Sequence, residues 1–306
     1  MKFFCLCMSP AVDASVTLPA WPSDGAVFKD VAEVENIGGK GINVARWLAI
    51  RGSQVSCGGL LGADNASQFE QELARYGIHD AFMRVPGATR RNEMIVTPQG
   101  SFKLNRPAFP RLPANLDALA TIDGARIPFA GSDTPYAAIL SGSLPATVPK
   151  DFYAKAIRAL KARGWKVALD ASGEAARLGV EAGPDVIKPN ADECAALIGF
   201  VPKAPEEFRR ATEMLRSYVA HVIISDGGAG AWFDGKFTAA PKVDALDTTA
   251  AGDTLLAEFC WRAWECDESL QDAAKQAVAA GSAAVTMPGS APPPTDLADQ
   301  LAEAME

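Results

Sequence analysis

Short apolar runs bounded by turn residues alternate along most of this chain with longer amphipathic stretches. This alternation is typical of parallel sheets whose two faces are covered by helices, because such strands are buried on both sides and joined by helical crossovers. We predict core strands at residues 3–8, 55–61, 137–140, 166–170, 186–188 and 222–225. Helical patterns lie at residues 42–51, 65–76, 150–163, 191–198, 205–218, 252–264 and 269–285. The chain is therefore expected to adopt an α/β fold with a doubly wound, mostly parallel sheet flanked by helices.

Two regions interrupt the alternation, at about residues 14–35 and 92–106. In the second region, strand-like residues 95–97 and 102–104 flank the sequence PQGS as the arms of a hairpin flank its turn. We expect these regions to form a small β-sheet that projects from the main domain as a lid; the alternative is a pair of surface hairpins without lid function. No repeat or linker divides the chain, so residues 1–306 are expected to form one domain. We attach no chemistry to residues 288–294 (PGSAPPP), which precede a terminal amphipathic helix.

Composition narrows the range of partners. The chain has 306 residues, of which 48% are hydrophobic, and this is ample material for a core. A net charge of -8 without basic runs argues against binding to nucleic acid or to an anionic membrane. No apolar segment approaches the ~20 residues that span a bilayer, and the run at residues 1–8 is too short for a signal peptide and predicts a buried strand. Six cysteines without a C-x-x-C pair, and only two histidines, predict free thiols in a cytoplasmic protein rather than disulfides or a zinc site.

The sequence DTTAAGD at residues 247–253 places small residues and a carboxylate at a predicted helix start. Backbone N–H groups in the first turn of a helix lack intrahelical partners and, together with the helix dipole, attract anions. Ala250, Ala251 and Gly252 leave these groups accessible. Asp253 could accept a proton from an attacking hydroxyl while the N–H groups stabilise a phosphoryl group in transit. The alternative is an ordinary N-cap, with Asp253 only complementing the helix dipole.

A second glycine cluster, NIGGKGINVAR at residues 36–46, also opens a predicted helix. In this order and at this separation, the two clusters resemble the two signatures of the ribokinase-like (PfkB) carbohydrate kinases. The resemblance runs from Ser9 to about residue 288. It implies transfer of the γ-phosphate of ATP to a sugar hydroxyl with Mg²⁺ present, Asp253 as the base, and residues 250–252 around the transferred group.

The same resemblance implies the sugar-binding residues. Asp13 matches the strand-end aspartate that holds sugar hydroxyls, and Gly38, Gly39 and Asn43 match positions that approach the sugar closely. Glycines permit such an approach, and an asparagine offers both a donor and an acceptor. An Asp leaving a buried strand can equally cap a turn, and this alternative stays open.

Three further features favour a sugar that already carries a phosphate. The sequence TRRN at residues 89–92 resembles an element of such family members, with Arg90 and Asn92 as contacts, and an arginine fork suits a phosphate. Ser143 follows a predicted strand, and Lys40 lies inside the glycine loop. The chain most resembles the 1-phosphofructokinase and tagatose-6-phosphate kinase members. The resemblance therefore predicts phosphorylation of fructose 1-phosphate to fructose 1,6-bisphosphate.

On the nucleotide side, KPNADE at residues 188–193 resembles the family's Asn-x-x-Glu element. This implies Lys188 and Asn190 near the ATP phosphates and Glu193 as a ligand, through water, of Mg²⁺. The spacing equally fits a capping box between Asn190 and Glu193, and both interpretations can hold. A glycine turn at residues 225–231 and small residues at 279–282 resemble the remaining nucleotide contacts, which are Ser225, Gly227, Gly230 and Ala280.

The chain departs from the family pattern at Ser9, Ala250 and Asp226. Ala250 stands where the second signature usually has glycine, and because alanine is a good helix former we expect a helical φ there. Asp226 would add negative charge beside the ATP phosphates. These departures keep two alternatives open: a kinase for an unphosphorylated sugar or nucleoside, and a non-catalytic sensor of sugar phosphate or nucleotide. A Rossmann dehydrogenase is disfavoured because the G-x-G-x-x-G spacing is missing. The sequence leaves open whether the lid joins two copies in a homodimer.

Overall fold

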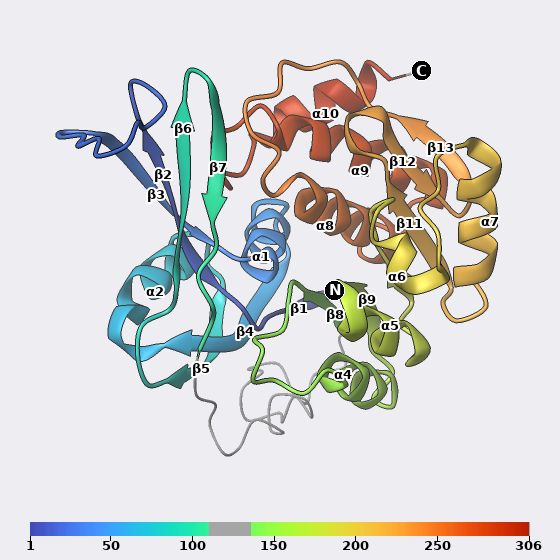
Figure 1. The fold of residues 1–306 in the computed structure, drawn as a ribbon. Coiled ribbons are helices and arrows are strands. Elements are labelled where there is room, and N and C mark those ends of the chain that lie inside the picture. The colour runs from blue at the N-terminus through green and yellow to red at the C-terminus, as the bar shows by residue number, and fades with distance from the viewer. Residues whose placement is uncertain (110–135, 306) are drawn as a thin grey trace.

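The computed structural model describes residues 1–109 and 136–305 of the chain, and within them nine strands form one large sheet (Figure 1). The strands from β11 to β5 pair in parallel, and β12 and β13 form an antiparallel hairpin at one edge. The predicted mostly parallel sheet is therefore confirmed. In sheet order the strands are β13 (Lys236–Ala239), β12 (Gly230–Phe233), β11 (His221–Ser225), β10 (Val186–Ile187), β9 (Lys166–Asp170), β8 (Tyr136–Ser141), β1 (Lys2–Cys7), β4 (Gln54–Gly62) and β5 (His79–Val85).

Helices cover both faces of this sheet (Figure 1). The central strand β1 shows why: Phe3, Cys5 and Cys7 point into one buried cluster, and the residues between them point into the other. The first face is covered by α1 (Lys40–Ile50), α2 (Ala66–Arg75), α8 (Ala251–Trp264), α9 (Leu270–Ala284) and α10 (Thr295–Glu303). The second face is covered by α4 (Phe152–Lys161), α5 (Gly173–Glu181), α6 (Cys194–Ile198) and α7 (Pro205–Leu215). None of the helices in the described part of the chain has the length and apolar character of a membrane span.

The order of the strands creates a switch point beside β1. The chain first adds β4 and β5 on one side of β1 and later returns to add β8, β9, β10 and β11 on the other side. Ligands of doubly wound sheets bind in the crevice that such a reversal opens beyond the carboxyl ends of the strands. The topology therefore predicts a site where β1 and β8 end.

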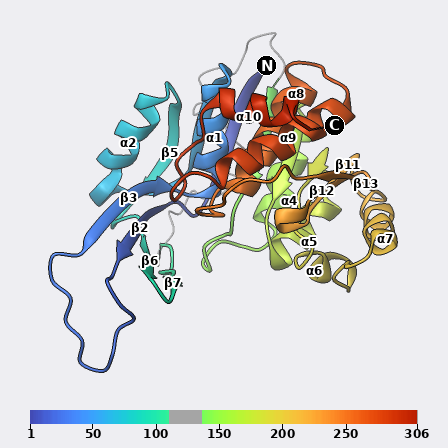
Figure 2. The ribbon, with the colours of Figure 1, turned by 90° about the horizontal axis from the view of Figure 1, so that it is seen from above.

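A second sheet of four strands accounts for the two regions that interrupt the alternation. It contains β3 (Ala32–Gly38), β2 (Ala11–Thr17), β6 (Arg91–Thr97) and β7 (Gly100–Leu104), in that order. Strand β2 pairs in parallel with β6, and β7 folds back on β6 with Thr97 opposite Gly100, as expected for the hairpin. In Figure 2 the connection between β2 and β3 projects far from the rest of the molecule. The small projecting sheet is thus confirmed.

One helix, one edge strand and one hairpin of the fold were not predicted. Helix α5 buries only small residues and Val180, so it lacks a strong apolar stripe. Strand β5 carries polar residues because it lies at the edge of the sheet. The β12–β13 hairpin turns at Asp234 and Gly235, both with positive φ (48° and 81°), and this Asp-Gly pair is a hairpin signal that the sequence analysis missed.

Candidate active site

A cavity of about 1070 Å³ lies at the predicted crevice, and both glycine clusters reach it. The N-termini of α1 and α8 open onto this cavity from different parts of the chain. Most of the predicted site residues line it, namely Asp13, Gly39, Lys40, Asn43, Arg90, Asn92, Ser143, Lys188, Asn190, Glu193, Ser225, Gly227, Gly230, Ala250, Ala251, Gly252 and Asp253. The tertiary structure therefore gathers residues that the sequence places far apart.

The first glycine cluster turns β3 into α1. Gly39 precedes α1 with a φ of 118°, and a side chain there would meet the Cys7 sulfur at 2.8 Å. Gly38 does not line the cavity. A Cβ at Gly38 would lie 2.0 Å from Oδ2 of Asp13, so the absence of a side chain makes room for that carboxylate. Asn92 donates from Nδ2 to Oδ1 of Asp13 at 2.9 Å and fixes the carboxylate at the cavity wall.

The second cluster contradicts one expectation from the sequence. Ala250 is the N-cap of α8 and has a φ of 63° and a ψ of -2°, which is left-handed rather than helical. The helical φ predicted from alanine's propensity is wrong, because the residue lies just outside the helix, where a turn of the other hand is required. Gly252 follows in the first turn, and a Cβ there would lie 3.1 Å from Nζ of Lys188. Glycine thus lets this ammonium approach the start of α8.

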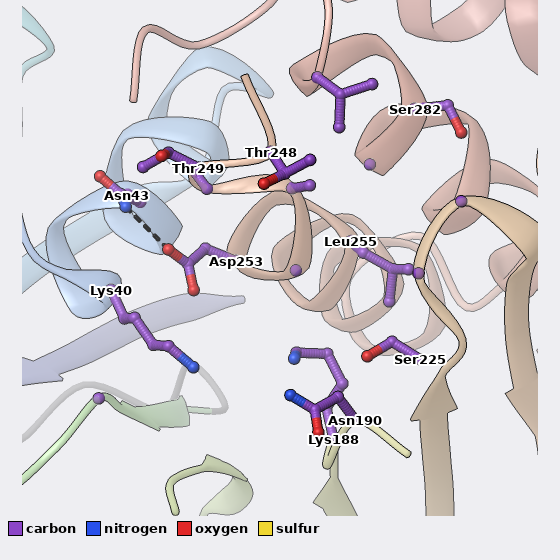
Figure 3. Close-up of a pocket in the computed structure, with 18 of the residues that line it drawn as sticks. Lys40, Asn43, Lys188, Asn190, Ser225, Thr248, Thr249, Asp253, Leu255 and Ser282 are labelled. Carbon is purple, nitrogen blue, oxygen red and sulfur yellow. Dashed lines mark hydrogen bonds between the residues drawn. The ribbon is translucent and has the colours of Figure 1, made fainter. Parts of the chain in front are cut away.

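Asp253 is buried in the first turn of α8 and accepts a hydrogen bond from Nδ2 of Asn43 at 2.8 Å (Figure 3). Burial raises the pKa of Asp253 to about 6; Lys40, Lys188 and the Asn43 hydrogen bond oppose this rise, and Asp170 adds to it. A carboxylate with such a pKa is ionised at neutral pH and is still a competent proton acceptor. Figure 3 shows Asn43 and Lys40 on one side of Asp253, with Ser225 and Ser282 on the other.

Asp170 is a central residue of the site that the sequence analysis missed. It ends β9, is fully buried, and pairs with Nζ of Lys40 at 3.2 Å and with Nζ of Lys188 at 3.3 Å. Burial acts to raise the pKa of Asp170, but Lys188 and Lys40 together hold it below its ordinary value. Asp170 therefore holds two cations from different elements beside Asp253. Its position at the carboxyl end of a predicted core strand was an available signal.

Arg90 and Arg91 differ in their surroundings although they are neighbours. Arg91 pairs with Glu33, Glu35 and Glu93 on the small sheet. Arg90 is half-buried at the cavity and forms no ion pair with any described residue; it donates only to the backbone carbonyls of Arg106 and Ser9, at 3.0 and 3.4 Å. Burial lowers the pKa of Arg90, with partial compensation from nearby Asp13. Among the residues that the structure describes, no carboxylate pairs with the positive charge that Arg90 brings to the cavity.

At the other end of the cavity, Asn190 and Glu193 form the reciprocal pair of a capping box. Asn190 N donates to Oε2 of Glu193 at 2.9 Å, and Glu193 N donates to Oδ1 of Asn190 at 2.7 Å. Both residues also line the cavity, so the capping interpretation holds and leaves a ligand role open. Ala280 is buried inside α9 and does not line the cavity; Gly281 and Ser282 do so instead. Asp226 is likewise absent from the cavity wall.

The family described as "pfkB family carbohydrate kinase" matches residues 24–296. The chain belongs to this family. It is 37% identical over 257 residues to a 1-phosphofructokinase of Rhodobacter capsulatus, a match that covers 82% of this chain and 80% of that protein. It is 31% identical over 299 residues to a 1-phosphofructokinase of Haloferax volcanii, covering 96% and 93%. The protein is thus a carbohydrate kinase with a 1-phosphofructokinase-like sequence, and its family implies a nucleotide as phosphate donor.

Solved structures share the fold. Phosphofructokinase-2 from Escherichia coli, in complex with substrates and products, matches with a TM-score of 0.89 at 23% identity over 100% of this chain and 99% of that chain. A possible 1-phosphofructokinase from Thermotoga maritima matches with a TM-score of 0.83 at 19% identity, covering 100% and 98%. The ribokinase-like architecture, with a large sheet and a small second sheet, is therefore common to this chain and these proteins.

Proposed function

We propose that this kinase transfers the γ-phosphoryl group of ATP to a free hydroxyl of a hexose phosphate, with fructose 1-phosphate as acceptor and fructose 1,6-bisphosphate as product. One observation carries the choice of a phosphorylated acceptor: Arg90 faces the cavity without an ion pair among the described residues. A partly desolvated guanidinium favours an anionic partner, and its planar fork fits two phosphate oxygens. Ser143 on the same cavity wall would add a hydroxyl.

The sugar itself would be held beside the small sheet. The Asp13 carboxylate is fixed by Asn92 and has room because Gly38 lacks a side chain. An ionised carboxylate only accepts hydrogen bonds and therefore selects hydroxyl groups. Because Asp13 belongs to β2 and Asn92 to β6, movement of the small sheet would carry this subsite with it. The small sheet would then act as the lid over the acceptor.

Transfer would occur at the start of α8. Asp253 would take the proton of the acceptor hydroxyl as that oxygen attacks the γ-phosphorus. The bond from the γ-phosphorus to the bridging oxygen breaks, and ADP leaves with the electron pair of that bond. Backbone N–H groups of Ala251, Gly252 and Asp253, which are first-turn groups without intrahelical partners, would hold the phosphoryl oxygens in transit.

Lys40 and Lys188 would neutralise charge on the moving phosphoryl group. Asp170 holds both ammonium groups, one from α1 and one from the end of β10, and Lys188 also lies against Gly252. A preorganised cation stabilises charge that develops in the transition state without reorganising at the moment of reaction. In this proposal Lys40 also contacts the phosphate of the acceptor, and the charges of Asp170 and Asp253 both act on its ammonium group.

Nucleotide and metal would occupy the opposite end. Mg²⁺ bound to ATP would neutralise the phosphates and retains most of its waters, which suits the single carboxylate of Glu193. The described residues contain no group of three side chains able to hold a metal on their own. The cavity lining also includes small and apolar side chains that suit a purine base, with Lys242 among them; the apolar ones are Ala240, Pro241, Val243, Val278 and Val285.

A kinase for an unphosphorylated sugar or nucleoside is the second candidate. It is favoured by the Lys40–Asp170 ion pair, because a lysine that already has a counter-ion contributes less to binding an acceptor phosphate. An acceptor phosphate would depend on Arg90 and Ser143, and an acceptor without a phosphate would not need them. A non-catalytic sensor is the third candidate, and it requires that the left-handed backbone of Ala250 abolishes turnover.

A coupled ADP-release assay with Mg²⁺ and ATP distinguishes these candidates. The acceptors are fructose 1-phosphate, fructose 6-phosphate, tagatose 6-phosphate, fructose and ribose, and Asp253→Asn is the matched inactive control. We expect the highest kcat/KM with fructose 1-phosphate. A higher kcat/KM with fructose or ribose than with every hexose phosphate would favour the second candidate. If no acceptor leads to ADP release, the protein would be assigned as a sensor.

A further inference from the structure

Arg46 is a buried cation that the reaction outlined above does not use. It lies one turn after Asn43 on α1 and is only 3% exposed. Its Nη1 donates to Oε1 of Glu72 at 2.9 Å, and its Nη2 donates to Oδ1 of Asn43 at 2.6 Å. Nη2 also lies 3.0 Å from the carbonyl oxygen of Ser290 and 3.2 Å from its hydroxyl. Arg46 therefore touches the same asparagine that donates to Asp253.

The contact with Arg46 dictates which way the Asn43 amide points. A guanidinium has only donors and stays protonated in proteins, so it can face the amide oxygen but not the amide nitrogen. With Oδ1 bound to Arg46, the NH₂ group must face Asp253, where Nδ2 lies 2.8 Å from Oδ2 (Figure 3). This assignment follows from the donor chemistry and not from the appearance of the two amide atoms.

We propose that Arg46 is a positioning residue for catalysis: it locks the Asn43 amide so that Asn43 holds one oxygen of Asp253 and leaves the other oxygen for the acceptor hydroxyl. The proposal rests on the role of Asp253 as the base. Without Arg46 the amide oxygen of Asn43 lacks its donor, so the amide is free to reorient toward other donors and its hydrogen bond to Asp253 is weakened. The carboxylate then loses both its fixed orientation and a donor to its ionised form.

Arg46 is itself held rigidly from two sides. Glu72 comes from α2, and Ser290 comes from the segment between α9 and α10, where a Cβ at Gly289 would lie 2.8 Å from Nδ2 of Asn36 on β3. The proline-rich segment to which the sequence assigned no role thus packs against the small sheet and delivers Ser290 to Arg46. A guanidinium that is already fixed by two partner residues loses little further freedom in holding a third group.

The charged surroundings of Asp253 set the expected direction of change. Lys40 from α1, Asp170 from β9, Lys188 from the end of β10 and the Cys7 thiol from β1 face this carboxylate or interact with it. Burial raises the pKa of Asp253, and the Asn43 hydrogen bond lowers it. Release of that bond should therefore move the acidic midpoint of kcat upward, by about 0.5 to 1 pH unit, while misorientation should reduce kcat at pH 8 by about tenfold.

The experiment compares kcat–pH profiles of Arg46→Met, Arg46→Lys, Asn43→Ala and the double variant Arg46→Met with Asn43→Ala. Arg46→Lys keeps a buried cation opposite Glu72 but lacks the fork that spans two partners, so it tests orientation in a chain that retains its charge. Arg51→Met is the matched control, because Arg51 follows α1, is also buried, and pairs with Glu258 and Asp299 without touching Asn43. It should lower the thermal midpoint but leave the kcat–pH midpoint unchanged.

We expect both Arg46 variants to shift the midpoint upward, and we expect Arg46→Met to have no further effect once Asn43 is alanine. A wild-type midpoint in folded Arg46→Lys would overturn the proposal, as would equal shifts from Arg46→Met with and without Asn43. Failure of the underlying function looks different: the wild-type profile would then lack an acidic limb near pH 6, and Asp253→Asn would stay active.

Discussion

Replacing Ala250 by glycine should stabilise this protein, although glycine normally weakens a helix. Ala250 has a φ of 63°, in the left-handed region that L side chains occupy at a cost. It lies at the N-cap of α8, directly before the helix start that would hold the transferred phosphoryl group. The residue is held there by its surroundings, and the strain it carries should be measurable as lost stability.

The magnitude follows from two opposing terms. The left-handed conformation costs an alanine about 1–2 kcal/mol relative to glycine. Glycine also gives the unfolded chain more conformational freedom, and this lowers the free energy of unfolding by about 0.4–1 kcal/mol. The net increase in the free energy of unfolding should therefore be about 1 kcal/mol, which raises Tm by about 1.5 °C in a domain of this size. Because Ala250 already has the left-handed backbone, kcat and both KM values should stay within about twofold of wild type.

The assay is urea and thermal unfolding of Ala250→Gly without ligands, with Ala251→Gly as the matched control. Ala251 is the next residue and the first of α8, so the same substitution there should lower stability, by up to about 1 kcal/mol. The two neighbouring changes should thus have opposite signs. If Ala250→Gly lowers Tm as Ala251→Gly does, the strain inferred at Ala250 is absent and the reasoning fails.

Two further predictions concern the proposed chemistry. Asp253→Asn should keep the fold and lose at least about a hundredfold in kcat; wild-type kcat should fall as the pH drops below about 6, because the base must be ionised. The pKa of Asp253 is raised in the folded protein, so its ionised carboxylate opposes folding above about pH 6. Asp253→Asn removes this charge, and the variant should therefore have a Tm no lower than that of the wild type at pH 8. Near-normal turnover in the folded variant would reject Asp253 as the base. Arg90→Ala should raise KM for the sugar phosphate and leave KM for ATP nearly unchanged; equal rises in both KM values would place Arg90 at the nucleotide instead. Lys40→Ala should also raise KM for the sugar phosphate, and it should lower kcat because Lys40 also serves the moving phosphoryl group.

The layered α/β fold and the two helix starts at the site were predictable from local patterns in the sequence. Burial on two faces favours a near-continuous apolar run in each inner parallel strand, so β1, β4, β8, β9, β10 and β11 leave a local trace. Glycines and small residues at a helix N-terminus are equally local, since the backbone groups that they expose belong to the same turn. Elements without such a trace, such as α5 with its small buried residues, were invisible to this reasoning.

The contacts among the side chains of the site depend on tertiary packing. Asp170 meets Lys40 and Lys188, and Arg46 meets Glu72 and Ser290, across separations that leave no periodic signal in the chain.

The left-handed backbone of Ala250 is also a tertiary outcome. The loop before it is pinned where Leu246 N and Asp247 N donate to the carbonyl oxygen of Val285, at 2.7 and 3.1 Å. Local propensity favours a helical alanine by a fraction of a kcal/mol or about 1 kcal/mol at most. The two hydrogen bonds to Val285 outweigh that preference, because the backbone between them and the first turn of α8 requires a left-handed residue at Ala250.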